Sequence, residues 1–320
     1  MKILVYISRI IVAITFIFSG FVKLVDPLGS AYKFEEYFGA DVLNLEFLIP
    51  YALPFAILLV LAEIMLGVML LVGYLPKITV WSLLGIMVVF LFLTWYSAYY
   101  NKVTDCGCFG DAVKLSQWGT FYKNVVLIFL VFIVLFGVKY IKPLFSLSMA
   151  KWSTFLFFFA FLYTTYHVLV HLPIIDFRPY AVGKSIVDGM QFNGEEEPKI
   201  HDFYLESNEG DDVTNKILEE DKVLLIVSKN LDKSDKEAFA EIKELTDKAL
   251  KEGYTVYMLT ASIEEEFLVL KQQFDLNFDM IFGDETMIKT IIRANPGIVT
   301  LSKGVVTGKW NWTDIDKVNL

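Results

Sequence analysis

The two cysteines of this chain lie in a single tripeptide. Residues 104 to 110 read TDCGCFG, and Cys106 and Cys108 are the only cysteines among 320 residues. One intervening glycine, Gly107, gives the backbone the freedom to close a small disulfide ring. Closing so short a loop adds little stability, and strain makes a disulfide easier to reduce. These residue types therefore favour thiol–disulfide exchange over a structural disulfide.

Two other interpretations of the cysteine pair remain open on spacing alone. A Cys-x-Cys pair can bind a soft ion such as Cu(I), and His167 and His171 could complete that site. The spacing is short for zinc, whose cysteine ligands usually lie two to four residues apart. Alternatively, the two side chains are small buried apolar groups in a tight loop.

The chain divides into an apolar half and an acidic half. Hydrophobic residues make up 55% of it and the mean hydropathy is +0.52, more apolar than is usual for soluble domains. Through Tyr180 there are 12 Lys/Arg and 9 Asp/Glu, a net charge of +3, and from Ala181 onward there are 16 and 28, a net charge of −12. We therefore expect a membrane domain followed by a soluble one, with no nucleic acid as partner.

Five apolar runs are long enough to cross a bilayer core of about 30 Å, which takes roughly 20 helical residues. The first continues into FSGFVKLVDPLG without a small-residue cleavage site, which favours a retained span over a signal peptide. The runs are Leu4–Val25, Tyr51–Val72, Ile78–Tyr99, Phe121–Tyr140 and Trp152–Leu172. Lysines in the short loops, above all the loop VKYIKP…MAK, favour a cytoplasmic N-terminus. The cysteine loop and the tail are then both extracytoplasmic.

Charged residues inside these runs are candidates for function, because a charge in a membrane is costly unless it is paired or solvated. Antiparallel packing of the first two runs would bring Arg9 and Glu63 to similar depths, so a direct pair is one expectation. Alternatives are a Lys23–Glu63 pair, an Arg9 at the cytoplasmic interface, and a Glu63 that lines a pocket for a quinone or a proton path. His167 and His171 share a helix face, where they either pack at the interface or contact a quinone or metal.

The tail has an alternating strand and helix pattern. Strands are expected at Lys222–Ser228, 254–260 and 280–282, helices at Ser234–Glu252 and Ile263–Phe274, and a final hairpin that turns at Ser302-Lys303-Gly304. This order, with Asn295-Pro296 before the hairpin, resembles a thioredoxin-like domain. That family carries Cys-x-x-Cys after the first of these strands, but this chain reads SKNLDKSD there. We therefore expect the tail to bind or dock a partner and to take no direct part in thiol exchange.

The membrane half resembles a known family. FIFSGFVKLVDPLGSAYKF and LAEIMLGVMLLVGY look like the first two spans of DoxX-type proteins, and DCGCFGD is similar to MauE, the methylamine-utilisation protein linked to disulfide maturation. The resemblance covers Met1–Ile141. It implies a four-helix membrane bundle, related in outline to quinone-linked disulfide-forming enzymes, in a fusion of the kind found in Bacteroidetes-type bacteria.

These observations predict an all-α membrane bundle with a fifth transmembrane helix, followed by a soluble α/β thioredoxin-like domain. The expected parts are residues 1–141 for the four-helix domain, 142–180 for the fifth helix and exit segment, 181–200 for a linker and 201–320 for the soluble domain. The predicted location is the bacterial inner membrane, with the tail in the periplasm.

The predicted function is redox maturation of an extracytoplasmic client through Cys106 and Cys108. Glu63, His167 and His171 are candidate cofactor contacts, and the resemblance implies a membrane quinone as electron acceptor. One departure stands against this function, because quinone-linked oxidases of this outline often use a second cysteine pair and this chain has none. The alternative is a non-enzymatic scaffold that anchors the tail in an envelope complex.

Overall fold

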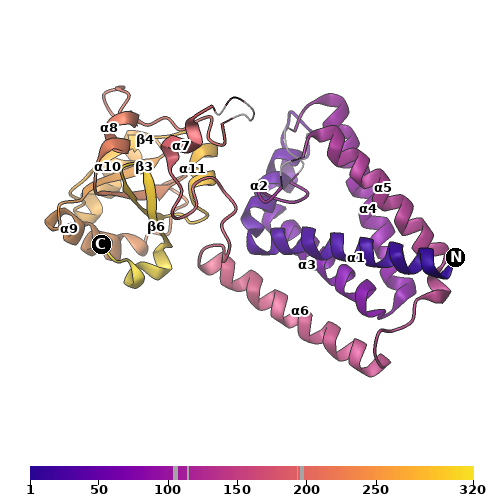
Figure 1. Cartoon of the computed structure of the whole chain (residues 1–320). Coiled ribbons are helices and arrows are strands. Elements are labelled where there is room, and N and C mark those ends of the chain that lie inside the picture. The colour runs from indigo at the N-terminus through magenta and orange to yellow at the C-terminus, as the bar shows by residue number, and fades with distance from the viewer. Residues whose placement is uncertain (104–106, 114, 193, 195–197) are drawn as a thin grey trace. The chain divides into compact units, whose positions relative to one another are not determined.

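The computed structural model describes residues 1–103, 107–113, 115–192, 194 and 198–320. It divides into two compact units, Met1–Leu169 and Val170–Leu320 (Figure 1), and each has a hydrophobic core of its own. Cys106, one of the two predicted redox cysteines, lies outside the described residues.

The first unit consists mainly of long apolar helices. Among the described residues, five helices are long and apolar enough to cross a membrane, which confirms the predicted membrane domain. Their bounds are α1 Lys2–Val25, α3 Ala52–Val72, α4 Pro76–Tyr100, α5 Gln117–Phe136 and α6 Leu147–Val170. Helix α5 ends before the predicted Tyr140, because Gly137 separates it from the 3-10 turn η2, Val138–Tyr140.

Two glycines let α1 and α3 pack closely. A Cβ atom on Gly20 would lie 2.6 Å from Ile64 Cβ, and one on Gly67 would lie 2.9 Å from the side chain of Ile17. Only a residue without a side chain fits at such distances, and small residues allow membrane helices to approach in this way. These contacts fix the antiparallel register of the two helices, and with it the residues that face each other across them.

A short helix, α2, follows α1 and is absent from the sequence-based expectation. It spans Pro27–Phe38, and Asp26 Oδ1 accepts a hydrogen bond from Gly29 N at 3.0 Å at its start. An aspartate cap followed by proline is a usual helix start. The 3-10 turn η1, Glu46–Tyr51, then leads into α3.

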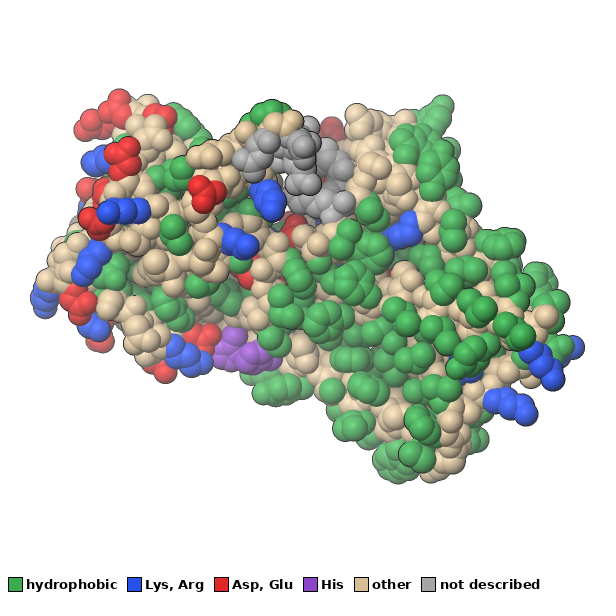
Figure 2. Space-filling model, viewed as in Figure 1, with side chains coloured by type: hydrophobic (Ala, Val, Ile, Leu, Met, Phe, Trp, Pro, Cys, Tyr) green, Lys and Arg blue, Asp and Glu red, His purple; other side chains and the backbone are tan. Residues whose placement is uncertain are grey.

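The surface of this unit is apolar where the membrane helices lie. Phe92, Phe129 and Leu156 are more than half exposed, and Figure 2 shows hydrophobic side chains over much of the visible face of these helices. Such a surface suits contact with lipid, as the predicted bilayer partner requires.

The second unit contains a mixed sheet in the order β1-β4-β3-β2-β5-β6. Strand β2 pairs in parallel with β3, and on its other side in antiparallel with β5, which forms a hairpin with β6. A β-α-β unit followed by an antiparallel hairpin beside its first strand is the thioredoxin-like arrangement, as predicted. The strands are β1 Glu206–Ser207, β2 Val223–Ser228, β3 Thr255–Thr260, β4 Asp279–Phe282, β5 Gly297–Ser302 and β6 Val305–Asn311.

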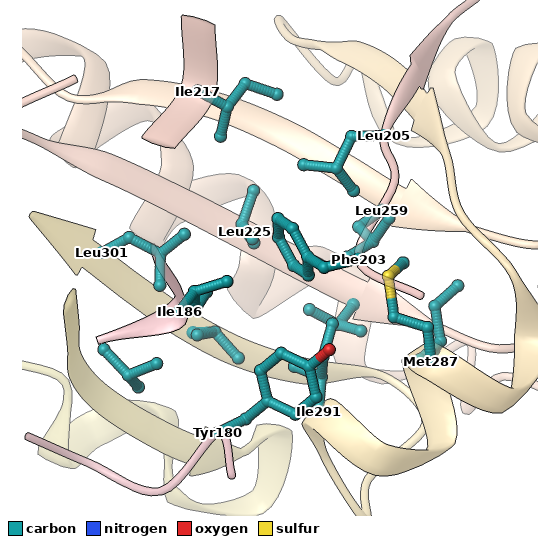
Figure 3. Packing of buried hydrophobic residues seen from close by; sticks show 14 of the residues in the cluster. Tyr180, Ile186, Phe203, Leu205, Ile217, Leu225, Leu259, Met287, Ile291 and Leu301 are labelled. Carbon is teal, nitrogen blue, oxygen red and sulfur yellow. The ribbon is translucent and has the colours of Figure 1, made fainter. Parts of the chain in front are cut away.

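Both faces of this sheet are covered. Alternate residues of β2 point to opposite faces, so that Leu225 joins one core (Figure 3) and Leu224 joins the other. Residues of α7 Ile186–Met190, α8 Thr214–Glu219 and α11 Glu285–Ile291 join the first core. Residues of α9 Ala238–Lys251, α10 Glu264–Phe274 and the 3-10 turn η3 Trp312–Lys317 join the second.

The segment expected as a linker contributes to the soluble core. Ile186 and Ile200, near its two ends, are 2% and 3% exposed and belong to the same cluster as Tyr180. Ile186 N also donates to Gly304 O in the final hairpin turn. The polar letters NGEEEPK predict a linker here, but Ile186 and Ile200 on either side of them belong to the core of the second unit.

Candidate functional site

The described part of the cysteine loop is attached to helix α1. Ser19 Oγ donates a hydrogen bond to Cys108 O at 2.6 Å. Gly107 has a φ of +64°, in the left-handed region that favours glycine, and a Cβ there would lie 3.0 Å from Lys33 Cγ. Cys108 itself is partly buried. The loop thus holds Cys108 in a defined place.

Neighbouring residues anchor the loop on both sides of the cysteines. Val103 O accepts hydrogen bonds from Ser97 Oγ at 2.8 Å and from Gln117 Nε2 at 2.7 Å. The Phe109 ring packs against Phe18, with ring centroids 5.5 Å apart, and Lys123 Nζ lies 4.1 Å from the Phe109 ring centroid. A cation so placed over a ring is attracted to it.

A buried ion pair lies next to this loop. Lys23 Nζ is 2.7 Å from Glu63 Oε2, and the two side chains are 7% and 2% exposed. Lys23 Nζ also donates to Ser19 Oγ at 3.1 Å, and the same hydroxyl bonds to Cys108 O. A chain of polar contacts therefore runs from Glu63 through Lys23 and Ser19 to the backbone of Cys108.

Arg9 does not pair with Glu63. Its guanidinium donates to three carbonyl oxygens, those of Leu70 and Leu71 at 2.8 Å and of Lys142 at 3.1 Å. Arg9 precedes Lys23 by fourteen residues, about 21 Å along the helix axis. Because Lys23 faces Glu63 in the α1–α3 register, Arg9 lies near the other end of the pair of helices. Of the alternatives, the structure has the Lys23–Glu63 pair.

A cavity opens between Lys23 and the cysteine loop. Its free volume is about 60 Å³, enough for a few water molecules. Apolar and aromatic side chains, including Phe34 and Phe90, form most of its wall, together with Lys33, Gly107 and Cys108. A smaller cavity nearby is bordered by Glu63, Lys123 and Cys108 among others.

The two candidate histidines lie in different surroundings. The His167 ring stacks on Tyr163, with centroids 6.3 Å apart. His171 Nδ1 is 2.8 Å from Asp314 Oδ2, and its carbonyl accepts a hydrogen bond from Asn311 Nδ2 at 3.3 Å. Within the described residues, no group of three or more His, Cys, Asp and Glu side chains could hold a metal ion.

The soluble domain carries a polar cluster where thioredoxins carry their cysteines. Ser228 Oγ lies 2.6 Å from Ser234 Oγ and donates to Asn295 Oδ1 at 2.8 Å, and Asn295 Nδ2 donates to Asn230 O at 3.1 Å. The Asn295-Pro296 peptide bond is cis. Hydroxyl and amide groups hold this loop in place, but they cannot exchange disulfides.

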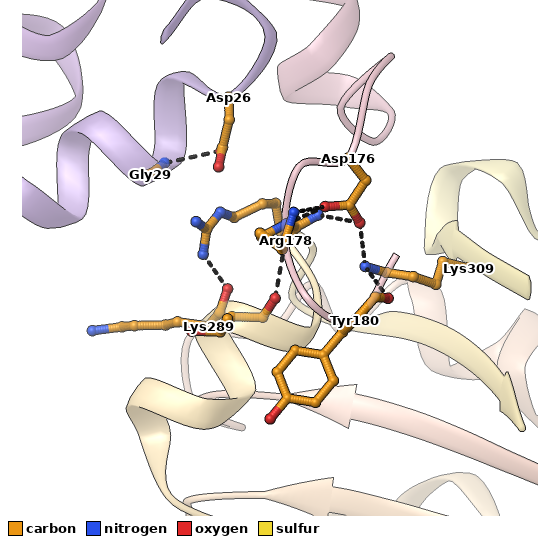
Figure 4. Close-up of polar contacts among 9 residues, drawn as sticks. Asp26, Gly29, Asp176, Arg178, Tyr180, Lys289 and Lys309 are labelled. Carbon is orange, nitrogen blue, oxygen red and sulfur yellow. Dashed lines mark hydrogen bonds and ion pairs between the residues drawn. The ribbon is translucent and has the colours of Figure 1, made fainter. Parts of the chain in front are cut away.

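A second buried charge cluster ties the exit segment to the soluble domain (Figure 4). Asp176 accepts from Arg178 Nε at 2.7 Å and from Lys309 Nζ at 2.6 Å. Burial raises the pKa of Asp176, but the charges of Arg178 and Lys309 outweigh it and hold the pKa below its ordinary value. Burial and the nearby Arg178 lower the pKa of Lys309 to about 7. Sequence reasoning missed this cluster, because Lys309 lies 133 residues from Asp176 in the chain.

Comparison with protein families gives a match for the first part of the chain. Residues 1–137 match the family model of the methylamine utilisation protein MauE, and none of the curated proteins gives a match. Among solved structures, the chain is similar to the thioredoxin domain of a thiol-disulfide oxidoreductase from Bacteroides vulgatus. That similarity has 16% identity and a TM-score of 0.28, and it covers 33% of this chain and 81% of the other. Residues 1–137 are thus similar to the MauE family, and the second unit has a thioredoxin-like strand order of its own.

Proposed function

We propose that this membrane protein exchanges disulfides with an extracytoplasmic client through Cys106 and Cys108. The observation that carries the proposal is the position of Cys108, in the wall of a membrane-domain cavity that Lys23 and Lys33 also line. Partly exposed cysteines beside lysines have stabilised thiolates, and the thiolate is the form that attacks disulfides and leaves them.

The exchange transfers two electrons and two protons. A client thiolate attacks one sulfur of the Cys106–Cys108 disulfide, the S–S bond breaks, and the other sulfur leaves as a thiolate with the electron pair. A second client thiolate then attacks the mixed disulfide. The client gains a disulfide, and Cys106 and Cys108 become a dithiol after taking up the two protons that the client loses.

Re-oxidation of the dithiol needs a two-electron acceptor, for which we propose a membrane quinone. Phe34, Tyr37 and Phe90 line the cavity with Lys23, and an aromatic head group with carbonyl acceptors would find suitable contacts there. The cavity would have to widen to admit a ring. We further propose that the cysteine loop and the second unit face the periplasm, where disulfides persist, and that the second unit recruits the client.

Trapping of a mixed disulfide tests this function. Cys106→Ser and Cys108→Ser each leave one thiol that cannot resolve such an intermediate, so one of the two variants should accumulate a disulfide-linked client on non-reducing gels. The cysteines of the captured protein should be unpaired in cells that lack this chain. The double serine variant is the control, and full function in that variant would overturn the proposal.

One observation favours a different function, that of a membrane-anchored scaffold. Ser228, Ser234 and Asn295 form a hydrogen-bonded cluster in place of a redox pair, so this part of the second unit has no thiol to exchange, and in this account the unit binds a partner. If the double serine variant keeps full function while removal of residues 201–320 abolishes it, the scaffold is the correct account.

A further inference from the structure

The Lys23–Glu63 pair is a charged pair inside the membrane domain, and disulfide exchange as described above does not distinguish the role of Lys23 from that of Lys33. Both side chains are almost fully buried, and burying two charges costs several kcal/mol even when they are paired. Lys23 Nζ also lies 5.1 Å from the centroid of the Phe90 ring. The fold thus holds one ammonium group in a fixed place inside the bundle, and intramembrane charges of this kind usually have a functional role.

Cys108 borders the same interior space as this pair. Lys23 and Cys108 both line the larger cavity, and Glu63 and Cys108 both line the smaller one. Ser19 connects them further, since its hydroxyl accepts from Lys23 Nζ and donates to Cys108 O. The arrangement places the ammonium group and the described cysteine next to the same solvent-sized volume.

Other charged groups also face Cys108, and they differ in burial. Lys33 lines the larger cavity and is paired with Glu36 at 2.8 Å, with both side chains about a third exposed. Lys123 borders the smaller cavity and lies over the Phe109 ring. Because water screens exposed charges, a buried ammonium group acts more strongly on a thiolate than an exposed one at the same distance. The Glu63 carboxylate pairs with Lys23 and also lines the smaller cavity, so it opposes part of the effect of Lys23.

We infer that Lys23, held in place by Glu63 and Ser19, is a positioning residue that stabilises the thiolate of Cys108. When the thiol ionises, its proton passes to water in the cavity and the negative charge remains on Sγ, at the cavity that the ammonium group also lines. When a disulfide at Cys108 is cleaved, the leaving sulfur keeps the electron pair and is stabilised in the same way. This inference deepens the proposed function and rests on it.

Alkylation of Cys108 tests the inference without any client. In full-length Cys106→Ser protein in membranes, Cys108 is the sole thiol, and its rate of reaction with iodoacetamide is measured from pH 5 to 10. Lys23→Met should move the midpoint of this profile upward by about one pH unit and slow alkylation at pH 6 roughly tenfold. Lys23→Arg should keep most of the original profile. Lys139→Met, which replaces a lysine in η2, is the matched control.

A double variant separates electrostatics from folding. Lys23→Leu with Glu63→Leu removes both charges, and such replacement of a buried pair usually preserves stability. It should melt near the parent protein and keep an upward shift, smaller than that of Lys23→Met because the opposing carboxylate is also absent. If Lys23→Met and the double variant both titrate like Lys139→Met, the inference is wrong. If the profile shifts as expected but no client is ever trapped, the proposed function fails and the electrostatic role of Lys23 stands.

Discussion

Lys23 and Glu63 form a buried ion pair across helices α1 and α3, with 2.7 Å between Nζ and Oε2. The pair forms because Gly20 and Gly67 bring the two helices together in one antiparallel register. That register also places Arg9 among the carbonyl oxygens of Leu70 and Leu71. From the sequence alone, both Arg9 and Lys23 are possible partners of Glu63. In the structure Lys23 pairs with Glu63, and Arg9 binds backbone carbonyl oxygens.

The ion pair should be costly to break and easy to replace. Glu63→Leu leaves the Lys23 ammonium buried without its counter-charge, so we expect a loss of about 3–5 kcal/mol of stability. Lys23→Leu with Glu63→Leu should recover most of that loss. Thermal unfolding of the full chain in detergent measures both variants, and an equally large loss in the double variant would contradict this account of the pair.

Close packing of α1 on α3 should depend on Gly20. A Cβ at Gly20 would come within 2.6 Å of Ile64 Cβ, whereas one at Gly85 in α4 meets nothing within 4 Å. We therefore expect Gly20→Ala to cost about 1–3 kcal/mol through overpacking. Gly85→Ala serves as the matched control and should leave the melting temperature almost unchanged. Equal melting temperatures for the two variants would show that α1 and α3 do not need this contact.

The exit cluster, formed by Asp176, Arg178 and Lys309, should stabilise the soluble domain far more than a surface ion pair does. Asp176→Ala removes the carboxylate that both Arg178 and Lys309 contact and leaves the Arg178 guanidinium, 2% exposed, without its counter-charge, and we expect a loss of about 3–5 kcal/mol. Asp221→Ala removes an exposed pair with Lys303 and should change stability by less than about 1 kcal/mol. Pulse proteolysis of the second unit in urea compares the two.

Lys309 should make the second unit more stable as the pH rises. Its pKa is about 7 in the folded chain and ordinarily 10.5, so the unfolded state binds more protons between these values. The free energy of unfolding therefore rises from pH 7 toward pH 10, by at most about 1.4 kcal/mol per pH unit from this group, and is unaffected by it below pH 7. Lys309→Met should lose this part of the slope in the same proteolysis assay. An identical slope in both proteins would show that Lys309 keeps its ordinary pKa.

Much of the architecture can be predicted from the sequence, because long apolar runs have few other interpretations. All five spans follow from the long apolar runs. The main strands of the second unit follow from short apolar runs that alternate with helical patterns along the chain. Helix α2 and the short helices α7, α8 and α11 are missed; the last three have only five to seven residues each, too few for a periodic pattern to stand out. The polar letters around residue 195 predict a linker, and the sequence therefore gives no sign that Ile186 and Ile200 belong to the core.

The candidate site is less predictable than the fold. The cysteine tripeptide is enough to locate the candidate loop in the sequence. The partner of Glu63 depends on the register between two helices, which no local sequence pattern determines. Estimates of depth from span boundaries err by a few residues, and each residue shifts position by about 1.5 Å along a helix. The exit cluster unites Asp176 with Lys309, more than a hundred residues apart, so only the folded chain brings its charges together.

The central claim, that Cys106 and Cys108 form a working redox pair, is tested most directly by following their oxidation state in living cells. A short pulse of dithiothreitol is applied and washed out, and thiols are then trapped with a maleimide that shifts the mobility of the chain. The account predicts a disulfide before the pulse, two thiols during it, and a return to the disulfide after washout. Two thiols that stay reduced in the absence of dithiothreitol would contradict it.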